Sequence, residues 1–484
     1  MRSRLKIAAM TDRARILVAI IFCVAVGGRG ASVVRTQAGA PAAAAPAQPA
    51  ALDAAALEKK VDELLTAHLS VNDFSGSILL ASQGKPLVAK GYGYANREWQ
   101  IPNTPRTKFR IGSVTKQFTS MLIMQLREQG KLKVEDSVCA YVTPCPDAWK
   151  PVTIHHLLTH TSGIPSYTSI ASWREQNMAP KSVEQMVAIF RDLPLQWSPG
   201  EKFGYNNSGY FLLGVVTEKA AGKKYEQALR EMILTPLGLT DTGYDWSRTI
   251  LPRRASGYSG QGAAVANAAA LDMQQPYSAG ALYSTVEDLF KWDQALYSER
   301  LVPEPAKKIM WTPAQSNYAY GWTIAQPSPA TFGHLRVAHS GGINGFSSVI
   351  IRVPETNVTA IVLANNDAVN ATAVGRDLLA LYYGQPYTVP APRTVAKVDP
   401  ALFDPYVGKY ELAPGFVITV SREGSSLMSQ ATGQGAFELF SESETKFFAK
   451  VAELTVEFVK GAGGTVTHFT LTQGGRVQQA TRVE

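Results

Sequence analysis

Residues 110–132 read RIGSVTKQFTSMLIMQLREQGKL, a Ser-x-x-Lys spacing followed by a long apolar pattern. After Gly112 and Ser113 the apolar residues recur at i, i+3 and i+4, which predicts a buried helix that ends at Gly130. Ser113 and Lys116 would then lie one turn apart on the same face. The start of a helix also favours negative charge on an activated oxygen. This stretch therefore predicts a serine nucleophile beside a lysine.

The spacing alone does not select this pair, because the chain contains four matches. The first match lies in an N-terminal leader, the second in a predicted hairpin and the last in a β-rich tail. Only the third precedes an apolar helical pattern. The four matches are Ser3/Lys6, Ser82/Lys85, Ser113/Lys116 and Ser443/Lys446.

A second candidate element is Tyr205-Asn206-Asn207, in a loop before a predicted helix at 208–222. A phenol near a lysine can have a lowered pKa and exchange protons with a nucleophile. The amide of Asn207 can hold the lysine and the acyl amide of a substrate. The same Tyr-x-Asn spacing occurs once more, at Tyr94 and Asn96 in a strand turn, and a plain turn with a core aromatic is the alternative interpretation.

A third element is His339-Ser340-Gly341, the only His-x-Gly in the chain. It lies in a predicted strand whose small residues allow the backbone to approach a substrate, so Ser340 and Gly341 are expected to bind it. The Gly342 N–H can then face the Ser113 N–H across an oxyanion. The alternative is that His339 is a structural histidine beside the sheet.

The three motifs, in this order, resemble those of the serine β-lactamase and penicillin-binding-protein superfamily. The chain is most similar to the class C-like branch, which includes D-aminopeptidases, D,D-carboxypeptidases and esterases. The resemblance covers residues 56–384. It extends to the phrases TIHHLLTHTSGIPSY, WSPGEKFGYNNSGY, SAGALYSTVEDLFKW and HSGGINGFSS. The tail resembles a lipocalin-like barrel.

The resemblance implies a role for each motif. Ser113 attacks a carbonyl carbon, and Lys116 and Tyr205 share the acid and base work as a coupled pair. Asn207 orients the lysine and the substrate. The N–H groups of Ser113 and Gly342 form the oxyanion hole.

One position departs from the pattern, because His339 stands where β-lactamases of this superfamily carry Lys. A histidine is only partly charged near neutral pH, so a fixed cation for a substrate carboxylate is missing. We therefore expect a serine hydrolase that acts on D-amino-acid peptides or esters. The alternatives are a β-lactamase or penicillin-binding D,D-carboxypeptidase, and a catalytically silent binding or assembly homologue.

The organisation of the chain predicts export and two domains. Basic residues and an apolar run of 12 residues, ILVAIIFCVAVG, indicate a signal peptide over residues 1–40, with an uncleaved anchor as the alternative. A periplasmic or secreted location follows. The predicted parts are a Pro/Ala-rich spacer at 41–55, the hydrolase domain at 56–384, a linker at 385–399 and an all-β barrel at 400–484.

The pattern of helices and strands predicts the fold of the hydrolase domain. Helical patterns at 57–69 and 370–384 flank mostly hairpin-linked strands, with one hairpin at Gln83-Gly84. This order favours an α+β sandwich with an antiparallel sheet and a helical region, rather than a doubly wound parallel sheet. The tail alternates in short runs that predict a small barrel filled by its aromatic residues.

The composition limits the classes of partner that we expect for this chain. The net charge of +8 comes largely from the first 40 residues, and the remainder holds 40 basic and 38 acidic residues, so nucleic acid is not an expected partner. Cys139 and Cys145 predict a local disulfide in an exported protein, or else two free thiols. The sequence has no metal-binding spacing and implies no cofactor. The expected partner is a small-molecule or peptide substrate, with membrane contact only through an uncleaved signal; the oligomeric state is left open.

Overall fold

The computed structural model describes residues 53–413, 415–432, 435–449, 454–461, 463–473 and 476–483. The chain divides into two compact units between Pro392 and Arg393. Within the described residues, no helix is both long and apolar enough to cross a membrane. The predicted signal peptide at 1–40 lies outside the described residues, as does most of the predicted spacer.

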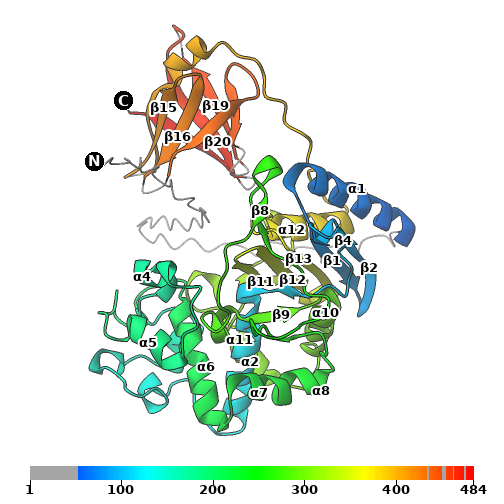
Figure 1. Ribbon diagram of the computed structural model, residues 1–484, viewed down its shortest axis with the longest axis vertical. Helices are drawn as coiled ribbons and strands as arrows, with labels where there is room; N and C mark the ends of the chain where they lie inside the picture. The colour runs from blue at the N-terminus through cyan, green and yellow to red at the C-terminus, as the bar shows by residue number, and fades with distance from the viewer. Residues whose placement is uncertain are drawn as a thin grey trace, which may run out of the picture. The chain divides into compact units, whose positions relative to one another are not determined.

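The large unit contains a six-stranded antiparallel sheet in the order β10-β11-β12-β13-β1-β2 (Figure 1). Strands β1 (Gly76–Ser82) and β13 (Val358–Ala364) are buried at every position. Their apolar sequences, GSILLAS and VTAIVLA, suit strands that are covered on both faces. The other strands are β2 (Lys85–Tyr92), β10 (Thr323–Ala325), β11 (Arg336–Ile343) and β12 (Phe346–Val353).

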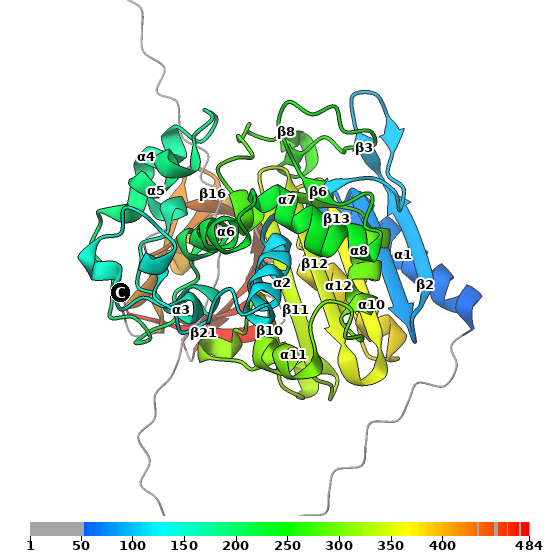
Figure 2. The same cartoon turned by 90° about the horizontal axis from the view of Figure 1, so that it is seen from below.

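Helices cover both faces of this sheet (Figure 2). Helices α1 (Ala54–Asn72) and α12 (Ala371–Tyr382) share one hydrophobic core with Ile78 and Leu80 of β1. The intervening residue Leu79 belongs to a second core with α2 (Thr115–Glu128) and α10 (Val286–Ala295). Because successive side chains of β1 point to opposite faces of the sheet, this strand contributes to both hydrophobic cores.

A helical region packs on the other side of α2. Helix α6 contacts both α2 and α9, so α2 lies between the sheet and the helical region (Figure 2). The other helices of the large unit are α3 (Ile154–Leu158), α4 (Ala171–Glu175), α5 (Val183–Arg191), α6 (Asn207–Ala221), α7 (Tyr225–Leu229), α8 (Thr235–Leu237), α9 (Tyr277–Gly280) and α11 (Glu304–Trp311). Short strands complete the unit: β3 (Tyr94–Asn96), β4 (Ile101–Pro102), β5 (Phe109–Arg110), β6 (Gly243–Tyr244), β7 (Tyr258–Ser259), β8 (Ala266–Asn267) and β9 (Leu282–Ser284).

The central helix begins slightly later than its sequence pattern indicates. Residues Gly112–Val114 form a 3-10 turn, and the α-helix runs from Thr115 to Glu128. Gly112 has a φ of 48°, a left-handed conformation that favours glycine and turns the chain into the helix. Ser113 therefore lies in the turn before α2, and not in its first α-helical turn.

The small unit is a closed barrel of eight antiparallel strands. Its core contains Tyr406, Tyr410, Phe447, Phe458 and Phe469. The predicted fold class, an α+β sandwich followed by a small all-β barrel, is confirmed. The strands are β14 (Gly408–Ala413), β15 (Phe416–Glu423), β16 (Ser426–Ala431), β17 (Phe437–Ser441), β18 (Lys446–Ala449), β19 (Leu454–Lys460), β20 (Val466–Gln473) and β21 (Arg476–Arg482).

A buried ion pair fastens α10 to the sheet. Arg352 on β12 donates from Nε to Asp293 Oδ1 at 2.7 Å, and both side chains are essentially inaccessible to solvent. Thr359 on β13 donates to the other carboxylate oxygen, also at 2.7 Å. The guanidinium lies over the rings of Tyr297 and Trp311, 4.5 and 5.2 Å from their centroids. Both charges are therefore compensated inside the protein.

We predict that Asp293→Ala destabilises the large unit by about 3 to 5 kcal/mol, because it leaves the Arg352 charge buried without a partner. Urea unfolding followed by tryptophan fluorescence measures the change. The matched control is Asp147→Ala, which removes an exposed pair with Lys150 and should give no measurable change. Equal unfolding midpoints for the two variants would contradict the prediction.

Candidate active site

The amine of Lys116 brings the first two sequence motifs together. Its Nζ lies 3.0 Å from Ser113 Oγ, 2.9 Å from Asn207 Oδ1 and 2.8 Å from the carbonyl oxygen of Ala279. Lys116 is completely buried, whereas Ser113 is partly exposed. The lysine therefore approaches the serine from inside the protein, and the serine hydroxyl faces the accessible side.

The charge of Lys116 follows from its surroundings. Among the described residues no carboxylate forms an ion pair with its amine. Burial lowers the pKa of Lys116 well below its usual value. This environment favours the neutral amine, which has a free lone pair.

Asn207 is held in place from two sides. It is the first residue of α6, and its backbone N–H donates to Ser166 Oγ at 3.1 Å. Its side-chain Nδ2 donates to Thr168 Oγ1 at 3.2 Å, which leaves Oδ1 to accept from Lys116. The preceding residue, Asn206, caps α6 by accepting the Gly209 N–H at 2.9 Å. The helix start therefore fixes the orientation of the amide.

Tyr205 lies over the same lysine, with its ring centroid 5.0 Å from Lys116 Nζ. Burial raises its pKa, and a hydrogen bond with Ser113 opposes that shift. The residue is 38% exposed, so part of the phenol borders the open side of the site. The sequence-based expectation of a lowered phenol pKa is wrong, because burial outweighs the opposing effect of the hydrogen bond with Ser113. The phenol therefore remains protonated at neutral pH.

His339 lies beside Tyr205, with ring centroids 6.3 Å apart, but both of its ring nitrogens are occupied. Nδ1 is 2.6 Å from the carbonyl oxygen of Ser340, which can only accept, so Nδ1 carries the proton. Nε2 then accepts from the hydroxyl of Tyr318 at 2.9 Å. Burial and the neighbouring Lys116 lower the pKa of His339 to about 3. The expected partial charge near neutral pH is therefore wrong, and this position is neutral.

The β11 strand packs directly on the turn that carries Ser113. A Cβ atom added at Gly341 would lie 2.0 Å from the carbonyl oxygen of Ile111 and 3.0 Å from the Ser113 nitrogen. A Cβ at Gly112 would lie 3.0 Å from the Gly342 nitrogen. A Cβ at Gly342 meets no atom within 4 Å, so that position faces open space. Ser340 is exposed on the same strand. The two predicted oxyanion donors thus belong to backbone segments in close contact.

Three other residues that match the Ser-x-x-Lys or Tyr-x-Asn spacing lie away from Lys116. Ser82 is in β1, where its hydroxyl contacts Tyr382 at 2.8 Å. Ser443 forms a tight turn by accepting the Lys446 N–H at 3.1 Å. Tyr94 is in the short strand β3. None of these three residues contacts Lys116 in the described part of the chain.

Several groups around the site were not predicted from the sequence. They include the carbonyl of Ala279, the hydroxyls of Ser166, Thr168 and Tyr318, and the ring of His160. Four of them lie in, or directly beside, the phrases that carry the family resemblance. The phrases were a signal that these segments matter, but they did not show which atom of each segment reaches the site.

The two cysteines of the large unit, and two histidines near them in the sequence, have local roles. The sulfur atoms of Cys139 and Cys145 lie at bonding distance in the loop after α2. His155 contacts the Tyr320 hydroxyl at 2.7 Å, and His156 accepts the Thr153 N–H in a capping box at the start of α3. Within the described ranges no group of three His, Cys, Asp or Glu side chains is placed to hold a metal ion.

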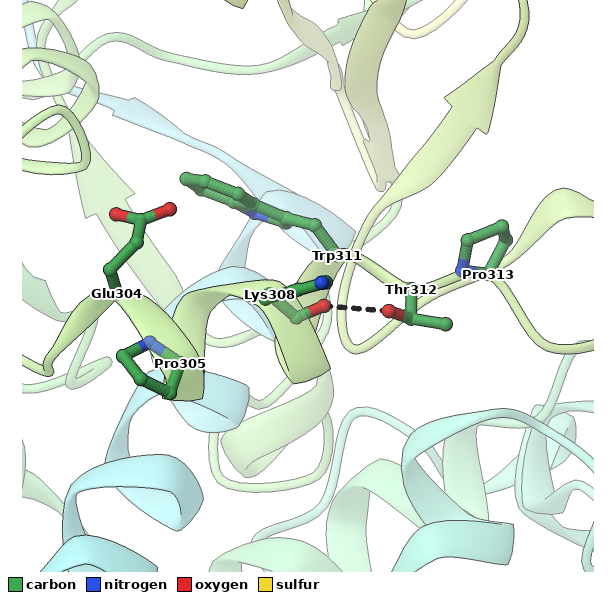
Figure 3. A pocket seen from close by; sticks show the side chains of 6 residues that line it. All are labelled: Glu304, Pro305, Lys308, Trp311, Thr312 and Pro313. Atoms are coloured by element: carbon green, nitrogen blue, oxygen red, sulfur yellow. Dashed lines mark hydrogen bonds between the residues drawn. The ribbon is translucent and has the colours of Figure 1, made fainter.

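A separate surface hollow lies along α11 (Figure 3). Its lining comprises Glu304, Pro305, Lys308, Trp311, Thr312 and Pro313. The Thr312 hydroxyl donates to the Lys308 carbonyl at 2.7 Å, and Trp311 packs on the buried Arg352. None of the predicted catalytic residues lines this hollow, and its residues serve the packing of α11.

Comparisons with known proteins give matches to both units of the chain. The family model described as Beta-lactamase matches residues 62–385, and the model described as Domain of unknown function (DUF3471) matches residues 392–482. Penicillin-binding protein 4* of Bacillus subtilis (strain 168) is 31% identical over 439 residues, which cover 85% of this chain and 96% of the relative.

Solved structures show the same architecture. The octameric penicillin-binding protein homologue from Pyrococcus abyssi is 27% identical, with a TM-score of 0.63, and the match covers 87% of this chain and 99% of that one. A D-amino acid amidase from Ochrobactrum anthropi SV3 is 23% identical, with a TM-score of 0.59 over 68% of this chain and 99% of that one. At this lower identity the similarity concerns the fold.

We predict that Gly341→Ala destabilises the large unit by about 2 kcal/mol or more, because its Cβ would collide with backbone that cannot move without shifting the Ser113 turn. Gly342→Ala is the matched control, since its Cβ enters open space, and it should stay within about 0.5 kcal/mol of the native protein. Urea unfolding compares the two. Similar losses in both variants would show that glycine at 341 is not a packing requirement.

Proposed function

We propose that this chain, which belongs to the Beta-lactamase family and is a serine hydrolase, cleaves an amide or ester bond through an acyl-enzyme on Ser113. The observation that carries the proposal is the three-way contact of the buried Lys116 amine with Ser113, Asn207 and Ala279. It places a buried amine within hydrogen-bond distance of the serine hydroxyl, where it can act as the base.

The hydrogen-bond count at Lys116 supports this role. A neutral amine has two hydrogens and one lone pair. The oxygens of Asn207 and Ala279 can only accept, so they take both hydrogens. The lone pair is left for the Ser113 hydroxyl, 3.0 Å away. Ser113 then donates its hydrogen to Lys116, which is the starting arrangement for general-base catalysis.

The proposed acylation balances its protons through Tyr205. As Ser113 Oγ bonds to the carbonyl carbon, its proton passes to Lys116. When the bond to the leaving nitrogen or oxygen breaks, that atom takes the phenolic proton of Tyr205, and Tyr205 regains a proton from Lys116. The raised pKa of Tyr205 supports this order, because the phenol is protonated before the reaction. Water hydrolyses the acyl-enzyme through the same groups in reverse.

The developing negative charge is proposed to lie against backbone donors. The N–H groups of Ser113 and Gly342 belong to segments that the glycines at 112 and 341 hold in contact. Preorganised N–H donors stabilise an oxyanion because they do not need to reorient during the reaction. Ser340 and Gly341 offer the adjoining strand to the substrate.

The substrate proposed is an amide or ester that needs no fixed cation, with D-amino-acid peptides and esters as the first choice. His339 is buried and neutral, and its nitrogens already bond to Ser340 and Tyr318. A substrate carboxylate would therefore find no positive charge at this position. A β-lactamase or D,D-carboxypeptidase activity is the second candidate, which the relatedness to penicillin-binding protein 4* favours.

We further propose that the chain acts in the periplasm or outside the cell. The apolar leader in the sequence and the sulfur contact between Cys139 and Cys145 both support this location, since disulfides persist in oxidising compartments.

We predict that acylation of Ser113 becomes faster as the pH rises through the pKa of Lys116, because only the neutral amine can accept the proton. Lys116→Arg keeps a cation that does not deprotonate, and it should lower the rate by about 10²- to 10⁴-fold. The rate at which a fluorophosphonate probe phosphonylates Ser113 with loss of fluoride, followed by intact mass at several pH values, measures how readily the serine is activated. The control Lys131→Arg changes an exposed lysine and should leave the profile unchanged. A native pH profile in Lys116→Arg would remove the lysine from the mechanism.

The substrate class is tested by a panel of D-alanine amide, p-nitrophenyl acetate and nitrocefin on the native protein and on Ser113→Ala. We expect kcat/KM for the amide or the ester to exceed that for nitrocefin by about tenfold or more, a difference of about 1.4 kcal/mol in transition-state stabilisation. Ser113→Ala should abolish all turnover. Preferred turnover of nitrocefin would favour the β-lactamase alternative, and no adduct on Ser113 with any probe would favour a catalytically silent homologue.

A further inference from the structure

A second histidine, His160, lies against the catalytic tyrosine without contacting Ser113. It is 1% exposed and has a φ of 58°, a left-handed conformation that is uncommon for a residue with a side chain. Its ring centroid lies 4.4 Å from that of Tyr205. A buried polar side chain in this backbone conformation costs folding free energy, which its contacts must offset.

The ring of His160 binds the backbone directly after Tyr205. The Asn206 N–H donates to Nδ1 at 3.0 Å. Nδ1 must therefore be unprotonated, and the ring proton is on Nε2. Nε2 has no hydrogen-bond partner among the residues that the structure describes, and it is packed among aromatic rings. Burial, helped by the nearby Lys116, holds the pKa of His160 well below its usual value, so the ring remains neutral.

The backbone of the same residue binds the chain directly before Tyr205. The Gly204 N–H donates to the carbonyl oxygen of His160 at 2.9 Å. His160 thus grips the residues on both sides of Tyr205, while its ring packs on the phenol. These contacts leave Tyr205 little freedom to move relative to Ser113 and Lys116.

We propose that His160 is a positioning residue, whose Nδ1 acceptor fixes the Tyr205–Asn207 segment against Ser113 and Lys116. The proposal rests on the acyl-enzyme function proposed above and extends it to a residue that does not touch the reacting atoms. A displacement of about 1 Å in a group that transfers protons can reduce a rate by about 10²-fold. Loss of the acceptor should therefore affect turnover more than substrate binding.

Three substitutions separate the acceptor from the bulk of the ring. His160→Asn keeps an acceptor on the atom next to Cγ, the position that Nδ1 occupies. His160→Gln places its amide one bond further out. His160→Phe keeps the ring and removes the acceptor. The matched control is His156→Phe, which removes a similar bond, from the Thr153 N–H to a histidine Nδ1, at the start of α3.

The steady-state hydrolysis of p-nitrophenyl acetate, normalised to the folded fraction from thermal unfolding, gives the test. We expect His160→Phe and His160→Gln to lower kcat by about 10²-fold with KM within about threefold, and His160→Asn to recover to within about tenfold of the native kcat. His156→Phe should lower stability but leave kcat unchanged.

Each other outcome overturns the proposal. Native kcat in folded His160→Phe would show that the acceptor has no role. Equal losses in the Asn and Phe variants, or an equal loss in His156→Phe, would indicate general destabilisation. If the Phe variant does not fold, the comparison of the Asn and Gln variants decides, and equal kcat values would refute the acceptor role. A native protein that neither turns over the ester nor forms an adduct on Ser113 would instead overturn the proposed function itself.

Discussion

The buried amine of Lys116 joins three segments that are far apart in the chain, the Ser113 turn, the start of α6 at Asn207 and the α9 carbonyl of Ala279. Transferring a lysine from water to this interior disfavours its charge, and the protein provides no carboxylate among the described residues to restore it. The buried amine is tolerated because three oxygen atoms lie within hydrogen-bond distance of it. These contacts tie α2 and the turn before it to α6 and α9, since the three partners come from three different elements.

Gly112 and Gly341 are the second constraint on the site, because they allow two backbone segments to lie very close together. Gly112 and Gly341 allow the backbone of the Ser113 turn and the β11 strand to approach until even a methyl group would collide. Because these two backbones approach closely, their N–H groups lie nearer to each other than larger residues at the glycine positions would allow. The sheet therefore contributes to the site mainly through main-chain atoms, whereas the helical region contributes side chains that hold and transfer protons.

Much of this could be predicted from the sequence, and the limits have physical causes. Apolar periodicity predicts the central helix, the hairpin and the barrel, because burial imposes period 3.6 or 2 directly on the side chains. The apolar helical pattern after Ser113 is what distinguishes it from Ser82 and Ser443 in the sequence. The Ala279 carbonyl could not be predicted, since a backbone acceptor has no signature in residue type. The protonation states of Tyr205 and His339 also depend on burial and on partners such as Tyr318, which only the fold brings near.

His339 shares its electrostatic environment with the rest of the site, where burial disfavours charge on the polar groups. Burial favours the neutral form of Lys116, Tyr205, His160 and His339 alike. A site of this kind does not attract an ionic substrate over a distance, as a charged cleft does. In the mechanism proposed above, such a site would instead stabilise charge that forms during the reaction, on the amine and on the oxyanion, because a low dielectric makes each hydrogen bond stronger. Selectivity must then come from shape and from hydrogen bonds along the β11 strand, and a neutral amide or ester meets those conditions at the lowest desolvation cost.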